Sequence, residues 1–192
     1  MEDSIVLRRQ PLRLLLVLAL CSFASAQIPE GNVFFGYSYL RADLSSGQGS
    51  NLNGWEGSLE GKVFPMLGVV VDISGHYGGA DVSLFCIHPG PCPPSAHISG
   101  SEYNVLFGPR LSASISKFRP FGHVLIGLGH VSASGSGFSN SDSTFATVVG
   151  GGLDYRIVHG IAWRFQGDYL QTRFFSGRQD NARLSTGLVL KF

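Results

Sequence analysis

Eight segments of this 192-residue chain alternate between apolar and polar residues with a period of two. That period places successive side chains on opposite faces of an extended chain, whereas a helix requires a period near 3.6. Each segment is about twelve residues long and ends at a turn or loop. The segments predicted to form strands are 32–43, 53–64, 68–79, 100–112, 119–131, 143–156, 161–173 and 181–192.

The segment 161–173 shows the alternation most clearly. Ile161, Trp163 and Phe165 fall on one face, and Arg164 and Asp168 fall on the other. Each predicted strand therefore has one apolar and one polar face.

The lengths of the strands and of their connections distinguish a membrane barrel from a soluble sandwich, which would also alternate. Strands in globular sheets usually have about 5–6 residues, whereas a tilted strand needs about 9–11 residues to cross a bilayer. Short connections alternate with longer ones rich in Gly, Ser, Asn and Pro, as in outer-membrane barrels with short periplasmic turns. The short connections are 65–67, 113–118 and 157–160, and the longer ones are 44–52, 80–99, 132–142 and 174–180. The sequence thus predicts an all-β fold, an eight-stranded antiparallel up-and-down transmembrane β-barrel, with both termini on the periplasmic side.

The polar face carries charges of both signs in nearly equal number. In a membrane barrel this face lines the lumen, where opposite charges neutralise one another. A soluble lipocalin-like binder, with the polar face in water, is the alternative. The predicted lumen charge network comprises Glu56, Glu60, Lys62, Asp72, Glu102, Arg110, Asp154, Arg164, Asp168, Arg183 and Lys191.

Aromatic residues near the strand ends favour the membrane reading, because Tyr and Trp gather at the two membrane–water interfaces. Closure of the barrel would also remove sheet edges, which hydrocarbon does not tolerate. The candidates for the two girdles are Tyr37, Tyr39, Trp55, Tyr77, Tyr103, Tyr155, Trp163 and Tyr169.

The N-terminus has the features of a secretory signal peptide. Arginines at 8, 9 and 13 precede a short apolar run, and Ala24-Ser25-Ala26 supplies small residues for a peptidase. We therefore expect a signal peptide at 1–26 and a barrel domain at 27–192, with Gln27 as the first mature residue. Removing the leader leaves equal numbers of acidic and basic residues, which gives no support for a nucleic-acid partner.

Two cysteines follow the leader, Cys86 and Cys92 in F-C-I-H-P-G-P-C-P-P. An even number of cysteines in an exported chain favours a disulfide. A metal site with His88 and His97 is the alternative, but we expect no metal and no other cofactor.

Three stretches resemble the small outer-membrane β-barrel proteins, OmpA-like in their transmembrane domain. They are N-V-F-F-G-Y-S-Y-L from Asn32, R-P-F-G-H-V-L-I-G-L-G from Arg119 and V-V-G-G-G-L-D-Y-R from Val148. The closing L-S-T-G-L-V-L-K-F, ending on Phe192, resembles the signal read by the barrel-assembly machinery. The resemblance covers 27–192 and implies location in the bacterial outer membrane, with its lipids and lipopolysaccharide as partners.

A barrel of eight strands has an interior about filled by side chains, which argues against a wide pore. We therefore expect a non-enzymatic protein that contributes to envelope integrity or surface interaction through its extracellular loops, with an unknown extracellular ligand.

The alternative function is a lipid A-modifying enzyme, similar to the deacylase barrels with their H-x-S pair. His130 and Ser132 share a face near the loop end of a predicted strand, and Asp142 begins the next strand. A hydroxyl, an imidazole and a carboxylate within reach form a nucleophilic set. H-x-S also occurs readily by chance in this serine-rich chain.

Overall fold

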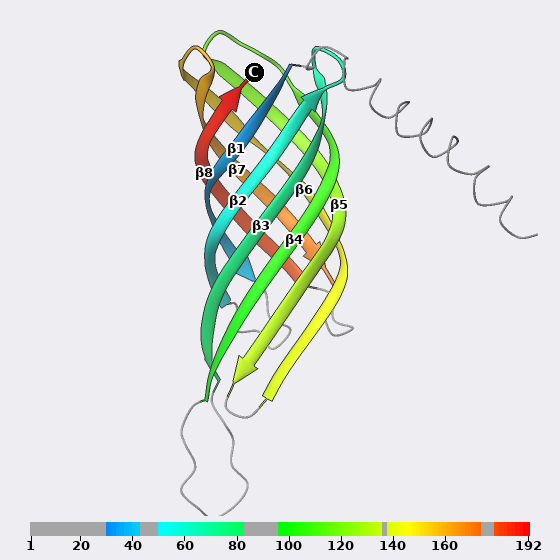
Figure 1. Cartoon of the computed structure of the whole chain (residues 1–192), viewed down its shortest axis with the longest axis vertical. Coiled ribbons are helices and arrows are strands. Elements are labelled where there is room, and N and C mark those ends of the chain that lie inside the picture. Colours follow the sequence, from blue (N-terminus) through cyan, green and yellow to red (C-terminus); the bar gives the residue numbers. More distant parts are fainter. Residues whose placement is uncertain (1–29, 43–49, 83–95, 136–137, 174–178) are drawn as a thin grey trace, which may run out of the picture.

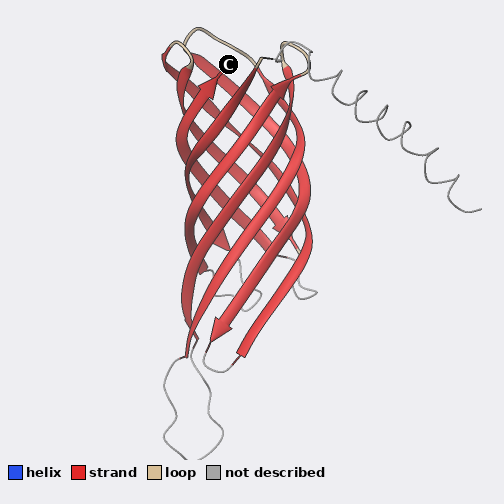
Figure 2. Cartoon of the chain, viewed as in Figure 1, coloured by secondary structure: helices blue, strands red, loops and turns tan. Residues whose placement is uncertain are grey.

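The computed structural model describes residues 30–42, 50–82, 96–135, 138–173 and 179–192, and these form a closed barrel (Figures 1 and 2). Each strand pairs antiparallel with its sequence neighbours, and β8 pairs with β1 to close the sheet. The strands are β1 (Gly31–Ala42), β2 (Ser50–Lys62), β3 (Leu67–Val82), β4 (Ala96–Ser112), β5 (Phe118–Gly135), β6 (Phe138–Val158), β7 (Ile161–Thr172) and β8 (Gln179–Lys191).

The predicted fold class is confirmed, and the alternation of residues explains it. Along β7 the odd-numbered residues are exposed and the even-numbered residues are buried from Ile161 to Leu170. Closure is completed by the ladder between β1 and β8, which runs from the pair Asn32–Lys191 to the pair Arg41–Ala182. No strand is left with an unpaired edge, as hydrocarbon requires.

The strands β3 to β6 are longer than the sequence predicts at their loop ends. Pairing continues to Val82–Ala96 in one hairpin and to Gly135–Phe138 in the next. Residues 80–99 and 132–142 were predicted as loops, but 80–82, 96–99, 132–135 and 138–142 form strands, so these boundaries were wrong. Residue composition misleads here, because ladder hydrogen bonds hold Ser- and Gly-rich segments extended despite their low strand propensity.

The short connections all lie at the end of the barrel where β8 ends and Phe192 follows it, which is the top of Figure 1. They comprise residues 63–66, 113–117 and 159–160. The last is a two-residue turn in which Gly160 has a φ of 81°, a left-handed conformation that favours glycine. Short turns face the periplasm in outer-membrane barrels, so we name this end the periplasmic end and the opposite one the extracellular end.

The outer face of the barrel carries a band of exposed apolar side chains. Phe165 and Leu128 are 58% and 65% exposed. A continuous apolar surface of this kind is unfavourable in water and suits hydrocarbon. This arrangement excludes the lipocalin-like alternative, whose outer face would be polar. Further members of the band are Phe35, Leu59, Val71, Ile73, Val105, Phe107, Val124, Ile126, Phe145, Val149, Leu184 and Leu188.

The aromatic residues lie on both sides of this band. Tyr155 and Trp163 lie near the periplasmic ends of β6 and β7, and the other six lie toward the extracellular ends of their strands. The Tyr103 hydroxyl donates to the Tyr77 hydroxyl at 3.0 Å, and the two rings meet edge to face. None of the described residues forms a helix long and apolar enough to cross a membrane.

Candidate functional site

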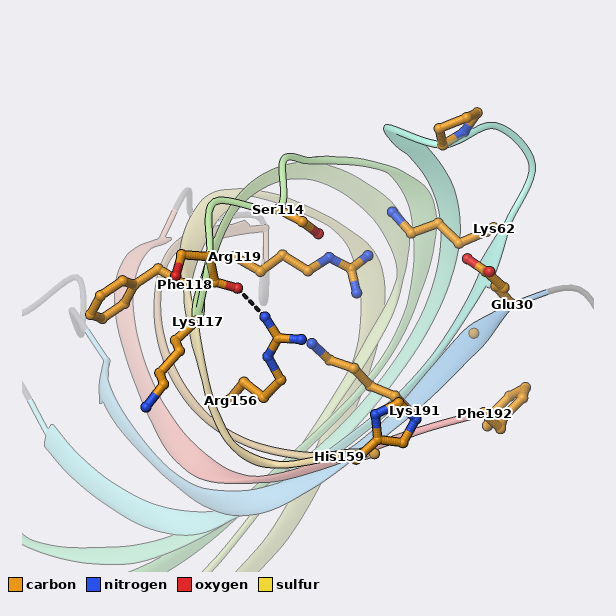
Figure 3. A pocket seen from close by; sticks show the side chains of 14 residues that line it. Glu30, Lys62, Ser114, Lys117, Phe118, Arg119, Arg156, His159, Lys191 and Phe192 are labelled. Atoms are coloured by element: carbon orange, nitrogen blue, oxygen red, sulfur yellow. Dashed lines mark hydrogen bonds between the residues drawn. The ribbon is translucent and has the colours of Figure 1, made fainter.

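A cavity of about 470 Å³ lies at the periplasmic mouth of the lumen (Figure 3). Its lining combines the starts and ends of several strands with the turns that join them. Most charged side chains of the lining are basic, and the lining includes one acidic residue, Glu30. The basic members are Lys62, Lys117, Arg119, Arg156 and Lys191.

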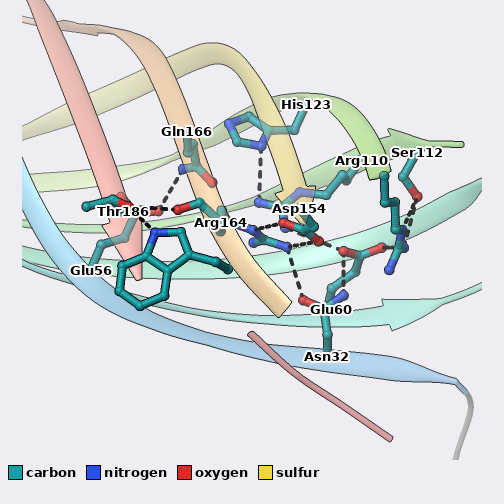
Figure 4. A network of polar contacts seen from close by, with 12 residues as sticks. Asn32, Glu56, Glu60, Arg110, Ser112, His123, Asp154, Arg164, Gln166 and Thr186 are labelled. Carbon is teal, nitrogen blue, oxygen red and sulfur yellow. Dashed lines mark hydrogen bonds and ion pairs between the residues drawn. The ribbon is translucent and has the colours of Figure 1, made fainter. Parts of the chain in front are cut away.

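Below this mouth the lumen is filled by polar side chains that contact one another across the barrel (Figure 4). These residues are buried because every second residue of each strand points inward. Most of their ion pairs belong to two clusters, one centred on a cation and one on a carboxylate.

The Arg183 cluster consists of Arg183 on β8 with Glu56, Asp72 and Asp168 from three other strands. The Arg183 guanidinium lies 2.6 Å from an Asp168 oxygen, 3.0 Å from an Asp72 oxygen and 3.4 Å from a Glu56 oxygen. All four side chains are fully buried in these pairs. A single cation therefore holds three carboxylates together.

Neutral donors add hydrogen bonds to two of these carboxylates, Glu56 and Asp168. The Gln166 amide donates to Glu56 at 2.7 Å and to Asp168 at 2.8 Å. The Ser185 hydroxyl donates to the other Glu56 oxygen at 2.5 Å. These hydrogen bonds offset part of the cost of burying more negative than positive charge.

The Glu60 cluster is the inverse arrangement, one carboxylate on β2 with the cations Lys62, Arg110 and Arg119. Glu60 oxygens lie 3.2 Å from the Lys62 ammonium and 3.0 Å and 3.4 Å from the Arg119 and Arg110 guanidiniums. The Asn32 amide also donates to Glu60 at 2.8 Å. Three cations thus share one carboxylate next to the periplasmic mouth.

A further ion pair joins Arg164 to Asp154 on adjacent strands. It is bidentate, with nitrogen–oxygen distances of 2.7 and 3.1 Å. The guanidiniums of Arg110 and Arg164 also lie over the Phe121 ring, at 4.5 and 4.6 Å from its centre. Cation–π contacts of this kind stabilise buried arginines whose carboxylate partners are few.

His123 connects the two clusters. Its Nδ1 lies 3.1 Å from Arg110 and its Nε2 lies 2.9 Å from Asp168. Because a guanidinium only donates, Nδ1 accepts from Arg110 and Nε2 donates to Asp168.

Glycines on β6 leave the space that these side chains occupy. A Cβ atom at Gly150 would lie 1.9 Å from an Asp168 carboxylate oxygen, and one at Gly152 would lie 2.8 Å from the Phe121 ring. A larger residue at either position would displace a member of the network.

The structure brings nine of the eleven residues of the sequence-predicted lumen network into ion pairs. Glu102 is buried and accepts from the Asn104 amide at 3.0 Å instead. Lys191 lines the periplasmic mouth and forms no ion pair with a described residue. Arg119 was missing from the predicted network. It lies four residues before His123 on β5 and therefore on the same face, which could have indicated an inward side chain.

The histidine, serine and aspartate considered for catalysis are not assembled as a triad in the described hairpin. His130 pairs across the ladder with Ser143, and their side chains share a hydrogen bond of 2.8 Å. Ser132 pairs with Ser141, and Asp142 pairs with Val131. Paired residues project from the same face of a sheet, so Asp142 projects from the face opposite His130 and Ser132. Its carboxylate accepts from the Ser143 main-chain nitrogen at 2.8 Å.

Several predicted features lie outside the described residues. They are the signal peptide, the cysteines at 86 and 92, and His88. Among the residues that the structure describes, no group of three His, Cys, Asp or Glu side chains could hold a metal ion. Phe192 is described: its main chain exchanges two hydrogen bonds with Gly31, of 3.0 and 3.1 Å, at the seam between β8 and β1.

Solved structures with similar folds include outer-membrane proteins. Ail of Yersinia pestis, crystallised with the heparin analogue sucrose octasulfate, is 19% identical with a TM-score of 0.60, over 86% of this chain and 100% of Ail. Neisserial surface protein A is 14% identical with a TM-score of 0.63, over 84% of this chain and 97% of that protein. OprG of Pseudomonas aeruginosa is 12% identical with a TM-score of 0.50, over 86% and 98% of the two chains.

No protein-family model matches the chain, and no curated protein matches it in sequence. The comparisons therefore establish the fold, which is that of the small outer-membrane barrels. Closed barrels with an apolar outer band are the β-structures that cross membranes. The protein lies in the bacterial outer membrane.

Proposed function

We propose that this chain is a non-enzymatic outer-membrane protein that acts through the surface at its extracellular end, while its barrel contributes to envelope integrity. The supporting observation is the extension of two hairpins beyond the apolar band. On β5 the outward residues change from Leu128 to His130, and on β6 they change from Phe145 to Ser143. The ladder nevertheless continues to the pair Gly135–Phe138, so a paired polar ribbon extends beyond the apolar band.

The chemistry of this ribbon favours a neutral, hydrogen-bonding partner over a polyanion. Its outward positions on the two strands are mostly serines, at 132, 134, 139, 141 and 143. The segments 43–49, 83–95, 136–137 and 174–178 contain no lysine and a single arginine. A sulfated ligand such as the heparin analogue bound by Ail would require more cations. We therefore propose that this chain does not share that ligand class.

Trimming the β5–β6 hairpin tests the proposal. Residues 132–141 are replaced by Asn-Gly, which joins the paired residues Val131 and Asp142 by a tight turn. We expect the variant to keep heat-modifiable gel mobility and wild-type surface levels, but to lose attachment of cells to surfaces bearing neutral glycans or protein. Resistance to detergent and large antibiotics should be lost in a deletion strain and kept in the trimmed variant. Attachment that survives deletion of the whole gene would refute the proposal.

The lipid A-modifying alternative predicts a chemical change in the outer leaflet. Among the residues that the structure describes, no carboxylate is hydrogen-bonded to His130 beside its contact with Ser143, and Asp142 projects from the other face. We therefore expect identical lipid A mass spectra from deletion and complemented strains. A lipid A species lost on deletion, and not restored by His130→Ala, would establish the enzyme instead.

We also propose that the partners of this chain include outer-membrane lipid, lipopolysaccharide and the barrel-assembly machinery, with Phe192 as the assembly signal of an OmpA-like barrel. Phe192→Ala should reduce the amount of protein in the outer membrane several-fold. In refolded protein the same substitution should lower the free energy of unfolding by about 1 kcal/mol, because the residue is 56% exposed, packs little against the rest of the barrel and lies at the membrane rim. Leu190→Ala, also on the lipid face of β8, is the matched control. Normal outer-membrane levels of Phe192→Ala would leave Phe192 as an ordinary interfacial aromatic.

A further inference from the structure

The periplasmic mouth concentrates positive charge that the described residues do not neutralise. Five basic side chains line its cavity, together with the carboxylate of Glu30. Two of the five, Lys62 and Arg119, share Glu60 with a third cation, Arg110. A carboxylate at the end of the chain would lower the excess by one and leave it positive.

Arg156 and Lys191 both contribute to this excess. Neither forms an ion pair with a residue that the structure describes. Arg156 donates a hydrogen bond to the main-chain oxygen of Ser116 in the turn between β4 and β5. That contact fixes the guanidinium and leaves its charge uncompensated.

Four cations point toward the centre of the mouth (Figure 3). Lys62 and Arg119 extend toward each other from opposite sides of the opening, and Arg156 and Lys191 meet near the middle, whereas Lys117 points away. Like charges held close together are unfavourable unless an anion or solvent compensates them. The arrangement therefore suits a ligand that carries more than one negative charge.

We propose that the periplasmic mouth binds a phosphate-type anion through Arg156, Lys191, Arg119 and Lys62. Guanidiniums match phosphate oxygens in a bidentate manner, and ammonium groups bind them as point charges. The cavity of about 470 Å³ lies within the range of about 300–1,000 Å³ typical of small-molecule sites. This site is independent of the extracellular surface proposed above, since it lies at the opposite end of the barrel.

Two sources could supply the phosphate: a soluble periplasmic compound, or the headgroup of an inner-leaflet phospholipid. The test uses the full chain refolded in a non-ionic detergent. Calorimetric titrations with pyrophosphate represent the soluble source. Titrations with dihexanoyl phosphatidylglycerol represent the lipid, and dihexanoyl phosphatidylcholine controls for its acyl chains.

We expect the wild-type protein to bind one of the two phosphate probes with a dissociation constant at or below about 1 mM. Arg156→Gln and Lys191→Gln should each weaken binding about tenfold or more, and Arg156→Lys should restore part of it. Arg41→Gln removes one charge at the extracellular end and should leave the affinity unchanged. Heat-modifiable mobility confirms folding, and each single variant provides the test if the other fails to fold.

The outcomes separate a built site from diffuse attraction. Tighter binding of pyrophosphate assigns the soluble source, and tighter binding of phosphatidylglycerol than of both other probes assigns the lipid; either supports the proposal. Equal losses in Arg156→Gln and Lys117→Gln would show attraction by net charge alone and would overturn it. Absence of binding by both phosphate probes would overturn it as well.

Discussion

The two ion-pair clusters in the lumen have opposite composition. The Arg183 cluster has one cation and three carboxylates, and the Glu60 cluster has one carboxylate and three cations. The near balance of acids and bases along the sequence therefore conceals a separation of charge along the barrel. Each cluster depends on its central residue, whose loss leaves three like charges together.

The clusters also differ in their access to solvent. The side chains of the Arg183 cluster are fully buried, whereas Lys62 and Arg119 in the Glu60 cluster are 13% and 12% exposed. Water at the periplasmic mouth can hydrate the latter two cations when they lose their partner. Loss of the central charge should therefore lower the free energy of unfolding more in the Arg183 cluster, in the middle of the barrel, than in the Glu60 cluster at its mouth.

Replacing Arg183 by methionine should have the largest effect. It leaves the carboxylates of Glu56, Asp72 and Asp168 buried without their shared cation. Breaking a buried ion pair costs about 3–5 kcal/mol. We expect the free energy of unfolding to fall by at least this amount. Unfolding by guanidinium chloride of protein in lipid vesicles measures it.

The control neutralises one of the three carboxylates in the Arg183→Met variant. Asp168→Asn added to Arg183→Met should recover part of the loss, because one of three unpaired charges is removed. A double variant no more stable than Arg183→Met would mean that the cost arises from packing rather than from charge.

Replacing Glu60 by glutamine should have a smaller effect, about 2 kcal/mol, because two of its three cations reach water at the mouth. The same guanidinium titration measures it. The variant should also bind the phosphate probe that the wild-type protein binds, and bind it more tightly, since the mouth gains positive charge. A cost equal to that of Arg183→Met would contradict the distinction between the two clusters.

Alternation along each strand was sufficient to predict which residues face the lumen, because a period of two assigns each residue to one face. It could not predict which of them meet. Glu56 and Gln166 are 110 residues apart in sequence and come from opposite parts of the barrel. Their contact depends on the stagger between all the intervening strands, which barrel closure fixes and no local pattern encodes.

The hairpin of β5 and β6 illustrates the same limit at the extracellular end. His130 and Ser132 were correctly predicted to share a face, but the side of Asp142 depends on the register of a hairpin in which 132–142 was predicted as loop. Because His130 pairs with Ser143, Asp142 falls on the other face. A shift of one residue in register would have reversed this result.

Replacing His123 by leucine should have the smallest effect and decides whether the two clusters act as one network. Asp168 keeps Arg183 and Gln166 as partners, and Arg110 keeps Glu60, so the loss should be about 1 kcal/mol. The sharper measurement is a double-mutant cycle between Arg110→Met and Asp168→Asn. In protein with His123 we expect a coupling energy of about 0.5–1 kcal/mol, since the imidazole transmits a change at either partner to the other. In His123→Leu protein the same two substitutions should be additive within about 0.3–0.5 kcal/mol. Coupling that persists without His123 would mean that the clusters interact through the field of their opposite charges, and that the hydrogen bonds of the imidazole are incidental to it.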